Sequence, residues 1–598
     1  MAGMVVFLIY MEPSNALKNP TRNTKMAPNA RSELLYDDHG RTVKLCYRGT
    51  ATAPTIRPSA KKDLVVVRDR QTYMTKFSHC VIPDASKKIK VIQADMPTYS
   101  IRPRFAQVTK ATPKLRFNTT IAKSLHCDVD NSKTRHEHHT TTKSLHCVAD
   151  NNETSHEPCI ITKSQLRARA ELGWVALDDG NVYDLSRFAR THPGGEHIIR
   201  AVAGRDAADL FHAFHPNIPT EARAHAMLKN MPVVARLCPA DRDDSALHRD
   251  FAALRAALER EGWYDTSYAF YAGQVAWLSF LFCLACTLTV HAHTLPHTLA
   301  ATAASALFLQ QTAFVGHDAG HAAITHRRGA DRVIGLVVGP LLTGLSISWW
   351  RDSHNTHHVV TNEAEHDPDI QHLPVLCVSK QAVAQGELYS SYHRKRFVVD
   401  ALATFFILRQ AVLFVPLIAL SRFNLYLQSF AWFWSWRVPP GKRQEAALEL
   451  ALMTLHHACA AAVVLRFASW PLGLTWYLGT NCLASVLNLQ IVSSHFGMDI
   501  VSDVDDIGAD ARFLRQQLVT TTDIKTTAWT AWFFGGLEHQ VAHHVCPRVP
   551  RHNLSRLACR LKELCRRHGL EYREDSFLGI LRGVRGALVA VTEVKLAM

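Results

Sequence analysis

The sequence has 598 residues, of which 47% are hydrophobic, and a formal net charge of +15. This length exceeds one ordinary domain, and the apolar residues concentrate in the second half, which predicts a multidomain chain with a membrane part. The basic residues gather in loops such as 326–332 and 548–567, which suits an anionic membrane face better than a nucleic-acid groove. The 14 cysteines are scattered, which favours neither a disulfide framework nor a zinc ribbon.

Residues 1–163 are rich in Thr, Asn, Lys and His and lack a sustained amphipathic period, so we predict a disordered extension. A segment repeats within it, because Lys123, Lys143 and Lys163 open similar stretches at equal intervals. The repeats carry no apolar face for stacking. They are therefore interpreted as a duplicated linker, or as translated non-coding sequence, and not as a solenoid.

Residues 164–240 have the composition of a small α+β domain and contain two histidines in distinctive settings. His192 stands in HPGG, where Pro and Gly allow a tight turn, and His215 ends the helical stretch FHAFHP. Two neutral imidazoles can hold a haem iron from both sides, which makes an electron carrier. The stretch resembles cytochrome b5, which implies haem b with His192 and His215 as axial ligands. His212 is the alternative second ligand, although the spacing favours His215.

Several apolar stretches lie in the second half of the chain, and four of them are long enough to cross a bilayer. Two others, 333–350 and 397–434, are interrupted by Pro or Arg, so we expect them in the interface plane or as re-entrant segments. Four crossings return the chain to its starting side, and the basic loops predict that this side is cytosolic. The four predicted crossings are residues 270–290, 299–316, 445–465 and 472–494.

Histidines cluster in three separate segments near the ends of apolar stretches, at the spacing of one helical turn. Residues three or four apart on a helix share one face, so each segment presents several imidazoles together. A solitary core histidine needs no such arrangement. The clusters are His317 and His321 in HDAGH, then His354, His357 and His358 in HNTHH, and finally Gln540, His543 and His544 in QVAHH.

Imidazoles brought this close repel one another when charged, and a metal ion holds them neutral. Seven histidines are too many for one four-coordinate site, so two metal ions are predicted. Iron is favoured over zinc because a haem electron carrier is part of the same chain, and no Met or Cys pattern favours copper. We expect neighbouring aspartates to accept hydrogen bonds from the outer ring nitrogens, namely Asp318, Asp352, Asp367 and Asp369.

The order HPGG, HDAGH, HNTHH and QVAHH over residues 164–595 resembles the front-end group of membrane fatty-acid desaturases with a fused N-terminal cytochrome b5. The resemblance implies that residues 241–598 form an all-α membrane domain with about four transmembrane helices and a cytosolic cap. It adds His495 to the iron ligands and gives Gln540 a role as ligand or in orienting the site. The chain departs from the family at Ala542, where an acidic residue is usual, and at Cys546, where an aromatic is common.

The resemblance also implies the reaction, with no catalytic residue beyond the metal ligands. Dioxygen is the co-substrate, an NADH-dependent cytochrome b5 reductase is the electron donor, and a cis double bond enters a long polyunsaturated acyl chain on the side of its polar head. The expected location is the endoplasmic reticulum membrane, with no nucleic-acid partner. Alternatives are a sphingolipid desaturase acting at the eighth carbon of the base, a hydroxylase, and an inert haem electron-transfer protein.

Overall fold

The computed structural model describes residues 30–36, 42–48 and 158–598, with gaps at 178–179, 436–437, 439, 502–506 and 508–509. The first two stretches are strands β1 (Ala30–Tyr36) and β2 (Thr42–Arg48), which pair in antiparallel fashion. Of the rest of the predicted extension the structure describes only residues 158–163, so the first two copies of its repeat lie outside the described residues.

The segment that begins at Pro158 folds into a small α+β domain around a four-stranded sheet in the order β3-β6-β5-β4. β5 pairs in antiparallel fashion with β4 and β6, and β3 runs parallel to β6. The sheet therefore starts before residue 164, where the sequence predicted the domain to begin. The strands are β3 (Cys159–Ile161), β4 (Trp174–Leu177), β5 (Asn181–Asp184) and β6 (Val233–Leu237), and the helices are α2 (Lys163–Arg167), α3 (Glu196–Val202), α4 (Ala208–Phe214) and α5 (Ala222–Lys229).

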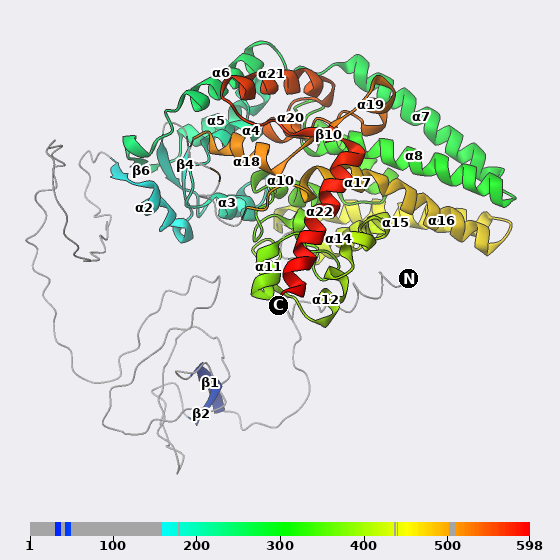
Figure 1. Ribbon diagram of the computed structural model, residues 1–598, viewed down its shortest axis with the longest axis horizontal. Coiled ribbons are helices and arrows are strands. Elements are labelled where there is room, and N and C mark those ends of the chain that lie inside the picture. The colour runs from blue at the N-terminus through cyan, green and yellow to red at the C-terminus, as the bar shows by residue number, and fades with distance from the viewer. Residues whose placement is uncertain are drawn as a thin grey trace, which may run out of the picture. The chain divides into compact units, whose positions relative to one another are not determined.

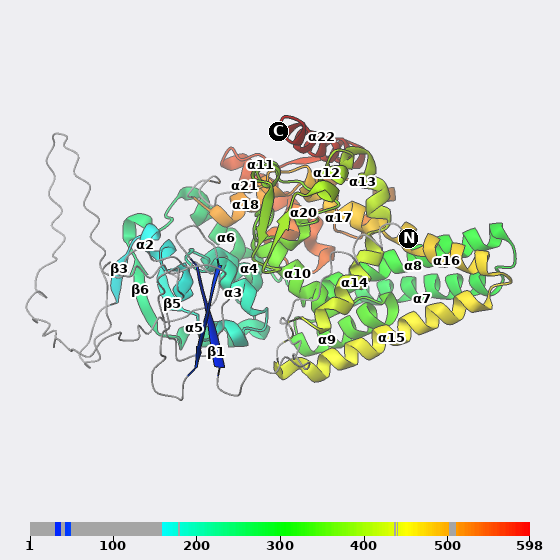
Figure 2. The same ribbon diagram turned by 90° about the horizontal axis from the view of Figure 1, so that it is seen from below.

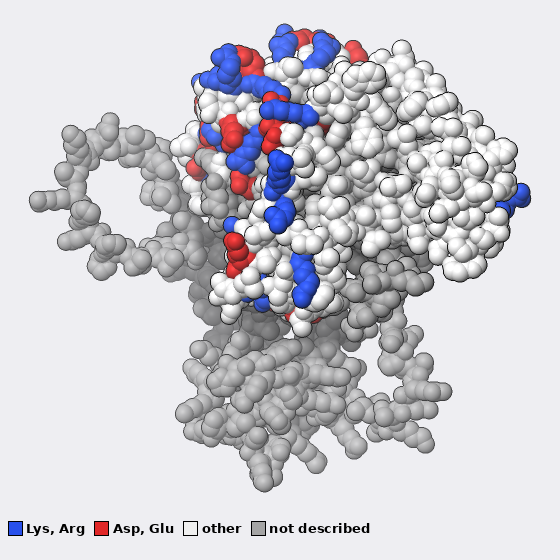
Figure 3. Space-filling view, turned by 45° about the vertical axis from the view of Figure 1, so that its right-hand side comes forward, with Lys and Arg blue, Asp and Glu red and all other residues white. Residues whose placement is uncertain are grey.

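Within the described part of the chain, three helices are long and apolar enough to cross a membrane: α7 (Tyr268–Val290), α8 (Leu295–Gly320) and α15 (Arg443–Arg466). α7 and α8 lie side by side (Figures 1 and 2). In the apolar stretch of α8, 72% is buried inside the protein, whereas in those of α7 and α15 only 11% is buried. α8 is therefore the inner helix, while its neighbours turn apolar side chains outward, and the broad surface without charged residues in Figure 3 agrees with a lipid-facing region.

The fourth predicted crossing is divided between two helices. α16 (Trp470–Ala484) packs along α8, and α17 (Val486–Phe496) follows after Ser485. α17 turns polar residues inward, because Gln490, Ser493 and Ser494 are buried beside His495. This buried polar end sets α17 apart from the apolar α16.

The two interrupted apolar stretches form sharply bent helix pairs, in agreement with the prediction that neither is a straight crossing. α9 (Arg328–Leu336) continues into the π-helical turn η5 (Val337–Thr343) and meets α10 (Ile347–Val359) at 108°. Gly344 adopts a positive φ of 72° at this bend, which a side chain would strain. α12 (Ala401–Ile407) and α13 (Gln410–Ala419) meet at 95°, and α14 (Ser421–Phe433) follows.

A cap of shorter helices covers the ends of the apolar helices and has its own core. α21 (Leu554–Arg567) buries one face at helical spacing and packs with α6 (Ala246–Arg260) and α20 (Gln540–Val545) in one apolar cluster. Ala542 and Cys546 belong to this cluster, so the two departures from the family pattern lie in an apolar core. The cap also contains α11 (Lys380–Gln385), β7 (Glu387–Ser390), β8 (Lys395–Val398), α18 (Arg512–Thr520), β9 (Asp523–Lys525), α19 (Ala528–Phe534), β10 (Glu574–Ser576) and α22 (Phe577–Leu596).

Truncation of the cap core should destabilise the segment that carries the third histidine cluster. Leu561 is fully buried in the cluster, so Leu561→Ala should lower the free energy of unfolding by about 2–5 kcal/mol. The measurement is the midpoint of thermal unfolding of the purified protein in detergent. Leu596→Ala, at a residue that is 69% exposed, is the control and should leave the midpoint unchanged. Equal midpoints for the two variants would contradict the packing.

Candidate metal centre and haem pocket

Four elements far apart in the sequence bring eight buried histidines together. α8 ends at the first cluster, and α10, which Ser346 caps by accepting a hydrogen bond from Trp349, carries the second. The short helix α20 carries the third, and α17 supplies one histidine near its end. The eight are His317, His321, His354, His357, His358, His495, His543 and His544.

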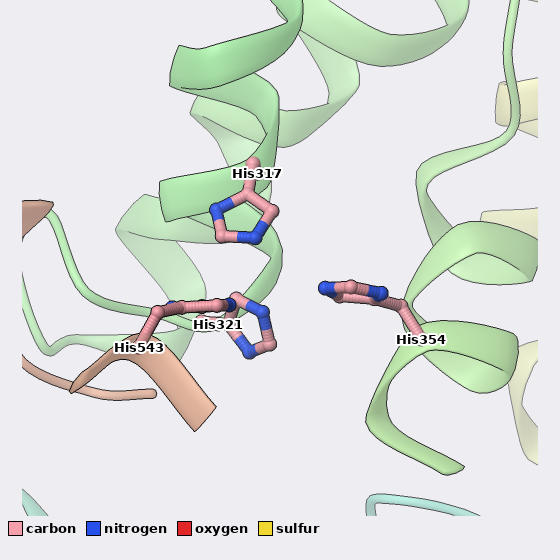
Figure 4. A group of neighbouring side chains, drawn as sticks. All are labelled: His317, His321, His354 and His543. Atoms are coloured by element: carbon pink, nitrogen blue, oxygen red, sulfur yellow. The ribbon is translucent and has the colours of Figure 1, made fainter. Parts of the chain in front are cut away.

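The imidazoles form two groups in which the ligand atoms lie within 4.8 Å of one another. The first group contains His317, His321, His354 and His543, whose rings converge on a common space in Figure 4. The second group contains His357, His495 and His544. The first group comes from α8, α10 and α20, and the second from α10, α17 and α20. Each group could hold one of two neighbouring metal ions.

His358 lies between the two groups. Its ring centroid is 4.0 Å from that of His544 and 4.6 Å from that of His543, and its Nε2 lies 3.1 Å from Nε2 of His354. Gln540 is buried on the same short helix, but its amide nitrogen donates to the carbonyl of Leu537. The structure therefore brings all the predicted histidines to the centre, and a role of Gln540 as ligand stays a prediction.

The chemistry of the donor set fits metal binding. Burial and neighbouring imidazoles lower the pKa of His543 and His544 well below the ordinary value, so both rings are neutral, the form that binds metals. Buried polar atoms normally have hydrogen-bond partners, and a bound ion is one explanation where they lack them. Within the eight histidines of the centre, the following ring nitrogens are buried without a partner among the described residues: Nδ1 of His317 and His358, both nitrogens of His321, and Nε2 of His495, His543 and His544.

Carboxylates fix the orientation of some of these rings. Nδ1 of His357 lies 2.8 Å from Oδ2 of Asp367, which leaves Nε2 for the centre. The corresponding distances are longer for His354 and Asp369, at 3.6 Å, and for His317 and Asp318, at 3.7 Å. Asp318 is itself held by Arg551 at 2.9 Å and by the hydroxyl of Tyr271 at 3.0 Å.

Asp352 lies against the N-terminal domain, with its carboxylate 3.4 Å from Nε2 of His197. The sequence had instead predicted Asp352 as an acceptor for a ligand histidine. The structure adds two acceptors that no motif indicated: Gln517 Oε1 lies 3.0 Å from Nδ1 of His544, and the carbonyl of Thr520 lies 3.1 Å from Nδ1 of His495. The only sequence signal for Gln517 is a glutamine pair within a short amphipathic helix.

A cavity of about 750 Å³ between the N-terminal domain and the membrane domain is lined by both predicted haem ligands. Nδ1 of His192 lies 3.3 Å from the carbonyl of Gly195, so Nε2 remains for an iron. Burial, together with the nearby His215, lowers the pKa of His192 to about 4, which keeps the ring neutral. A Cβ at Gly194 would lie 2.8 Å from the His192 ring, so this position of HPGG tolerates no side chain. The alternative ligand His212 stacks on His225 and is not part of the cavity wall.

Glu221 holds His215 and links it to the rest of the protein. Its Oε2 lies 3.1 Å from Nδ1 of His215, and its two oxygens pair with Arg548 at 2.8 Å and Arg328 at 2.9 Å. Burial alone raises the pKa of Glu221, but His215 and the two guanidinium groups bring it below its ordinary value. The carboxylate is therefore ionised, and it ties the haem ligand to two residues of the membrane domain.

The haem cavity adjoins the metal centre. Arg205 makes a bidentate contact with Glu363, at 2.6 and 2.8 Å, that fixes the N-terminal domain against the membrane domain. The ring of Phe214, next to His215, lies 6.3 Å from the ring of His358. His321 belongs to the first metal-binding group and also lines the haem cavity. The side chain of His321 therefore contributes to both sites.

Comparisons with known proteins agree with this geometry. The family described as "Fatty acid desaturase" matches residues 292–576, and "Cytochrome b5-like Heme/Steroid binding domain" matches residues 162–238. Delta(8)-fatty-acid desaturase 2 of Arabidopsis thaliana is 32% identical over 425 residues, which cover 70% of this chain and 90% of that protein. Delta 8-(E)-sphingolipid desaturase of Emericella nidulans is 34% identical over 356 residues, with 57% and 62% covered. Acyl-lipid (9-3)-desaturase of Borago officinalis is 27% identical, with 70% and 90% covered. The matches confirm the resemblance that the motifs indicated.

Loss of the Asp367 carboxylate should weaken iron binding. Asp367→Asn removes the charged acceptor for His357, and such changes lower metal affinity or activity by about 10- to 100-fold. The measurement is iron per polypeptide by mass spectrometry after dialysis against a chelator. Glu365→Gln, at an exposed carboxylate two residues away, is the matched control and should retain iron. Equal retention by both variants would show that Asp367 does not hold the ring.

A change at Glu221 should alter the haem. Glu221→Gln replaces a carboxylate beside His215 with a neutral amide, which makes the ligand less electron-rich and favours ferrous over ferric haem. The reduction potential should rise by tens of millivolts in a spectroelectrochemical titration. Glu171→Gln, at an exposed site in the same domain, should leave the potential unchanged. An unchanged or lower potential in Glu221→Gln would contradict this role.

Proposed function

The chain belongs to the fatty acid desaturase family and carries a fused cytochrome b5-like domain, and from that premise we propose that its eight histidines hold two iron ions supplied with electrons through its own haem. The protein is a membrane oxidoreductase that desaturates long-chain lipids. The observation that carries the proposal is the position of His321, which belongs to the first metal-binding group and also forms part of the haem cavity wall.

The chemistry of desaturation explains why the chain needs both sites. Iron at the histidine centre supplies the oxidising power that an unactivated C–H bond requires, and haem between His192 and His215 supplies electrons. In the net reaction two hydrogens would leave adjacent carbons, two electrons would come through the haem and two protons from water, and dioxygen would be reduced to two molecules of water. The protein holds the imidazoles neutral, fixes their tautomers through Asp367 and Gln517, and buries the centre away from bulk water.

Several residues support electron transfer between the two sites. Phe214 and His215 are neighbours in the chain, and the ring of Phe214 meets that of His358 between the two metal-binding groups. The paired contacts of Glu221 with Arg548 and of Arg205 with Glu363 hold the donor domain at a fixed distance. A fused and docked donor replaces a collision between two proteins with an intramolecular step.

We propose the front-end type of desaturation, with the double bond entering on the polar-head side of the chain. The relatives named above support the eighth carbon as its position, since two of them are described by that position. The substrate is a long polyunsaturated acyl chain or, as the alternative, the long-chain base of a sphingolipid. The Emericella nidulans relative supports the alternative because its name specifies a sphingolipid and the (E) geometry.

The proposed location is the endoplasmic reticulum membrane, with the haem domain and the histidine clusters on the cytosolic side. The basic segment around Arg328 and the basic helix α21 support this orientation by the positive-inside rule. A cytosolic haem domain is also accessible to the proposed partner, an NADH-dependent cytochrome b5 reductase.

Expression in a yeast that makes neither polyunsaturated acyl chains nor Δ8-unsaturated long-chain bases tests the function. We expect a new double bond in the fed acyl chain or in the endogenous base, located by mass spectrometry of derivatised lipids. His317→Ala removes one ligand of the first group and should abolish the product. His212→Ala, at the histidine outside both sites, should retain it.

The two substrate classes give different products, so fatty acids and long-chain bases are analysed separately. A product in the base alone would establish the sphingolipid alternative, and a hydroxylated chain without a double bond would establish a hydroxylase. Intact haem absorption with no new double bond in either pool would refute desaturation and favour an inert haem protein.

A further inference from the structure

The haem cavity is built from both domains, and the two contribute different chemistry. The N-terminal domain supplies most of its apolar residues, among them Leu185, Ile198 and Phe211, together with His192 and His215. The membrane domain supplies most of its basic residues. These are Arg328 and Arg332 on α9, Arg351 on α10, Lys442 just before α15, and Arg548 after α20.

The positive charge on this wall exceeds the negative charge. Six basic residues line the cavity, whereas Glu221 and Glu445 are its only acidic residues within the described part of the chain. Glu221 is shared by two arginines, and Glu445 pairs with Arg332. Arg351 and Lys442 make no ion pair with any described residue. Burial lowers the pKa of Lys442, the positive charge of Arg351 on the same cavity wall lowers it further, and Glu445 raises it.

Two half-buried cations on the wall of one cavity, neither in an ion pair with a described residue, favour an anionic ligand there, because charges withdrawn from water are normally paired. Haem b is an apolar disc with two carboxylates on one edge, and the cavity has the matching division into apolar and basic walls. We propose that Arg351 and Lys442 of the membrane domain bind the haem propionates, so that the membrane domain completes the haem site. This inference rests on the proposed haem between His192 and His215.

A lipid head group could in principle supply the anion instead, as a phosphate or a carboxylate. The haem carboxylates are favoured because the two cations line the same cavity as both axial histidines, and most of its apolar lining belongs to the haem domain. One consequence is thermodynamic. A ligand that touches both domains stabilises their docked arrangement, so haem occupancy and docking are linked.

The test compares two haems in the full-length protein, prepared as apoprotein from a haem-deficient host. One sample receives haem b and the other receives haem dimethyl ester, which lacks the carboxylate charges. The variants are Arg351→Met and Lys442→Met, and the control is Arg443→Met, at the adjacent exposed residue outside the cavity. The readouts are the rate of haem transfer to excess apomyoglobin and the haem reduction potential.

In the unmodified protein and in Arg443→Met, haem b should leave about tenfold more slowly than the dimethyl ester, as charge-assisted hydrogen bonds predict. Each cavity variant should reduce this ratio toward one and lower the reduction potential with haem b, because the lost cation favoured the ferrous form. The ester serves as the second measurement where a variant is less stable, since misfolding would accelerate the loss of both haems equally and leave the ratio high.

A ratio that stays near tenfold in both cavity variants would overturn the inference. A raised KM for the lipid with unchanged haem release would also overturn it and assign the cations to the lipid head group. Either result, obtained alongside normal desaturation by the unmodified protein, leaves the proposed function intact. Absence of a bis-histidine haem spectrum in the unmodified protein would instead refute the haem on which the inference rests.

Discussion

Eight imidazole rings are buried against one another where α8, α10, α17 and α20 meet, and several of their nitrogens have no partner among the described residues. Burying eight imidazole rings together is unfavourable if the rings are charged, because they repel one another and lose hydration. If the rings are neutral, some of their nitrogens lack hydrogen-bond partners. Metal ions bound by the neutral rings would remove both costs. The surrounding structure meets this requirement: α8 is the most buried of the spanning helices, the cap core supports α20 from behind, and Asp367 and Gln517 orient individual rings.

The same constraint reaches the haem domain through Glu221 and His321. Glu221 is an ionised carboxylate that contacts an axial ligand on one side and two arginines of the membrane domain on the other. Breaking a buried ion pair is costly because it leaves one charge uncompensated. If the haem domain moved away from the membrane domain, the ion pairs of Glu221 with Arg328 and Arg548 would break, and the contact of Glu221 with His215 would be disturbed at the same time. The contact therefore favours one docked position and couples that position to the chemistry of the haem.

The sequence indicated which histidines share a helix face because that information is local, and the structure brings these histidines together. Imidazoles three or four residues apart on a helix share a face whatever the fold, and the position of each cluster beside an apolar stretch placed them at one depth. The same reasoning could not find Gln517 or Thr520, since α18 approaches α17 and α20 only through tertiary packing. It also predicted a fourth continuous crossing where the chain forms α16 and α17, because hydropathy averages over the buried polar residues near His495. Asp352 was assigned to the centre by proximity in sequence, yet it lies on the face of α10 that meets the haem domain.

The basic wall of the haem cavity shows how far function can lie from any motif. Arg351 lies three residues before the HNTHH cluster. Lys442 lies directly before the spanning helix α15, where a basic residue is ordinarily interpreted as a topology marker. Lys442 can serve both as a topology marker and as a haem-binding residue, because the haem domain docks at the membrane surface where Lys442 lies. A haem domain that evolved alone would need its own groups to hold the haem carboxylates. In the fused chain the membrane domain can supply these groups. The haem site is then complete only when the haem domain is docked beside the metal centre that receives its electrons.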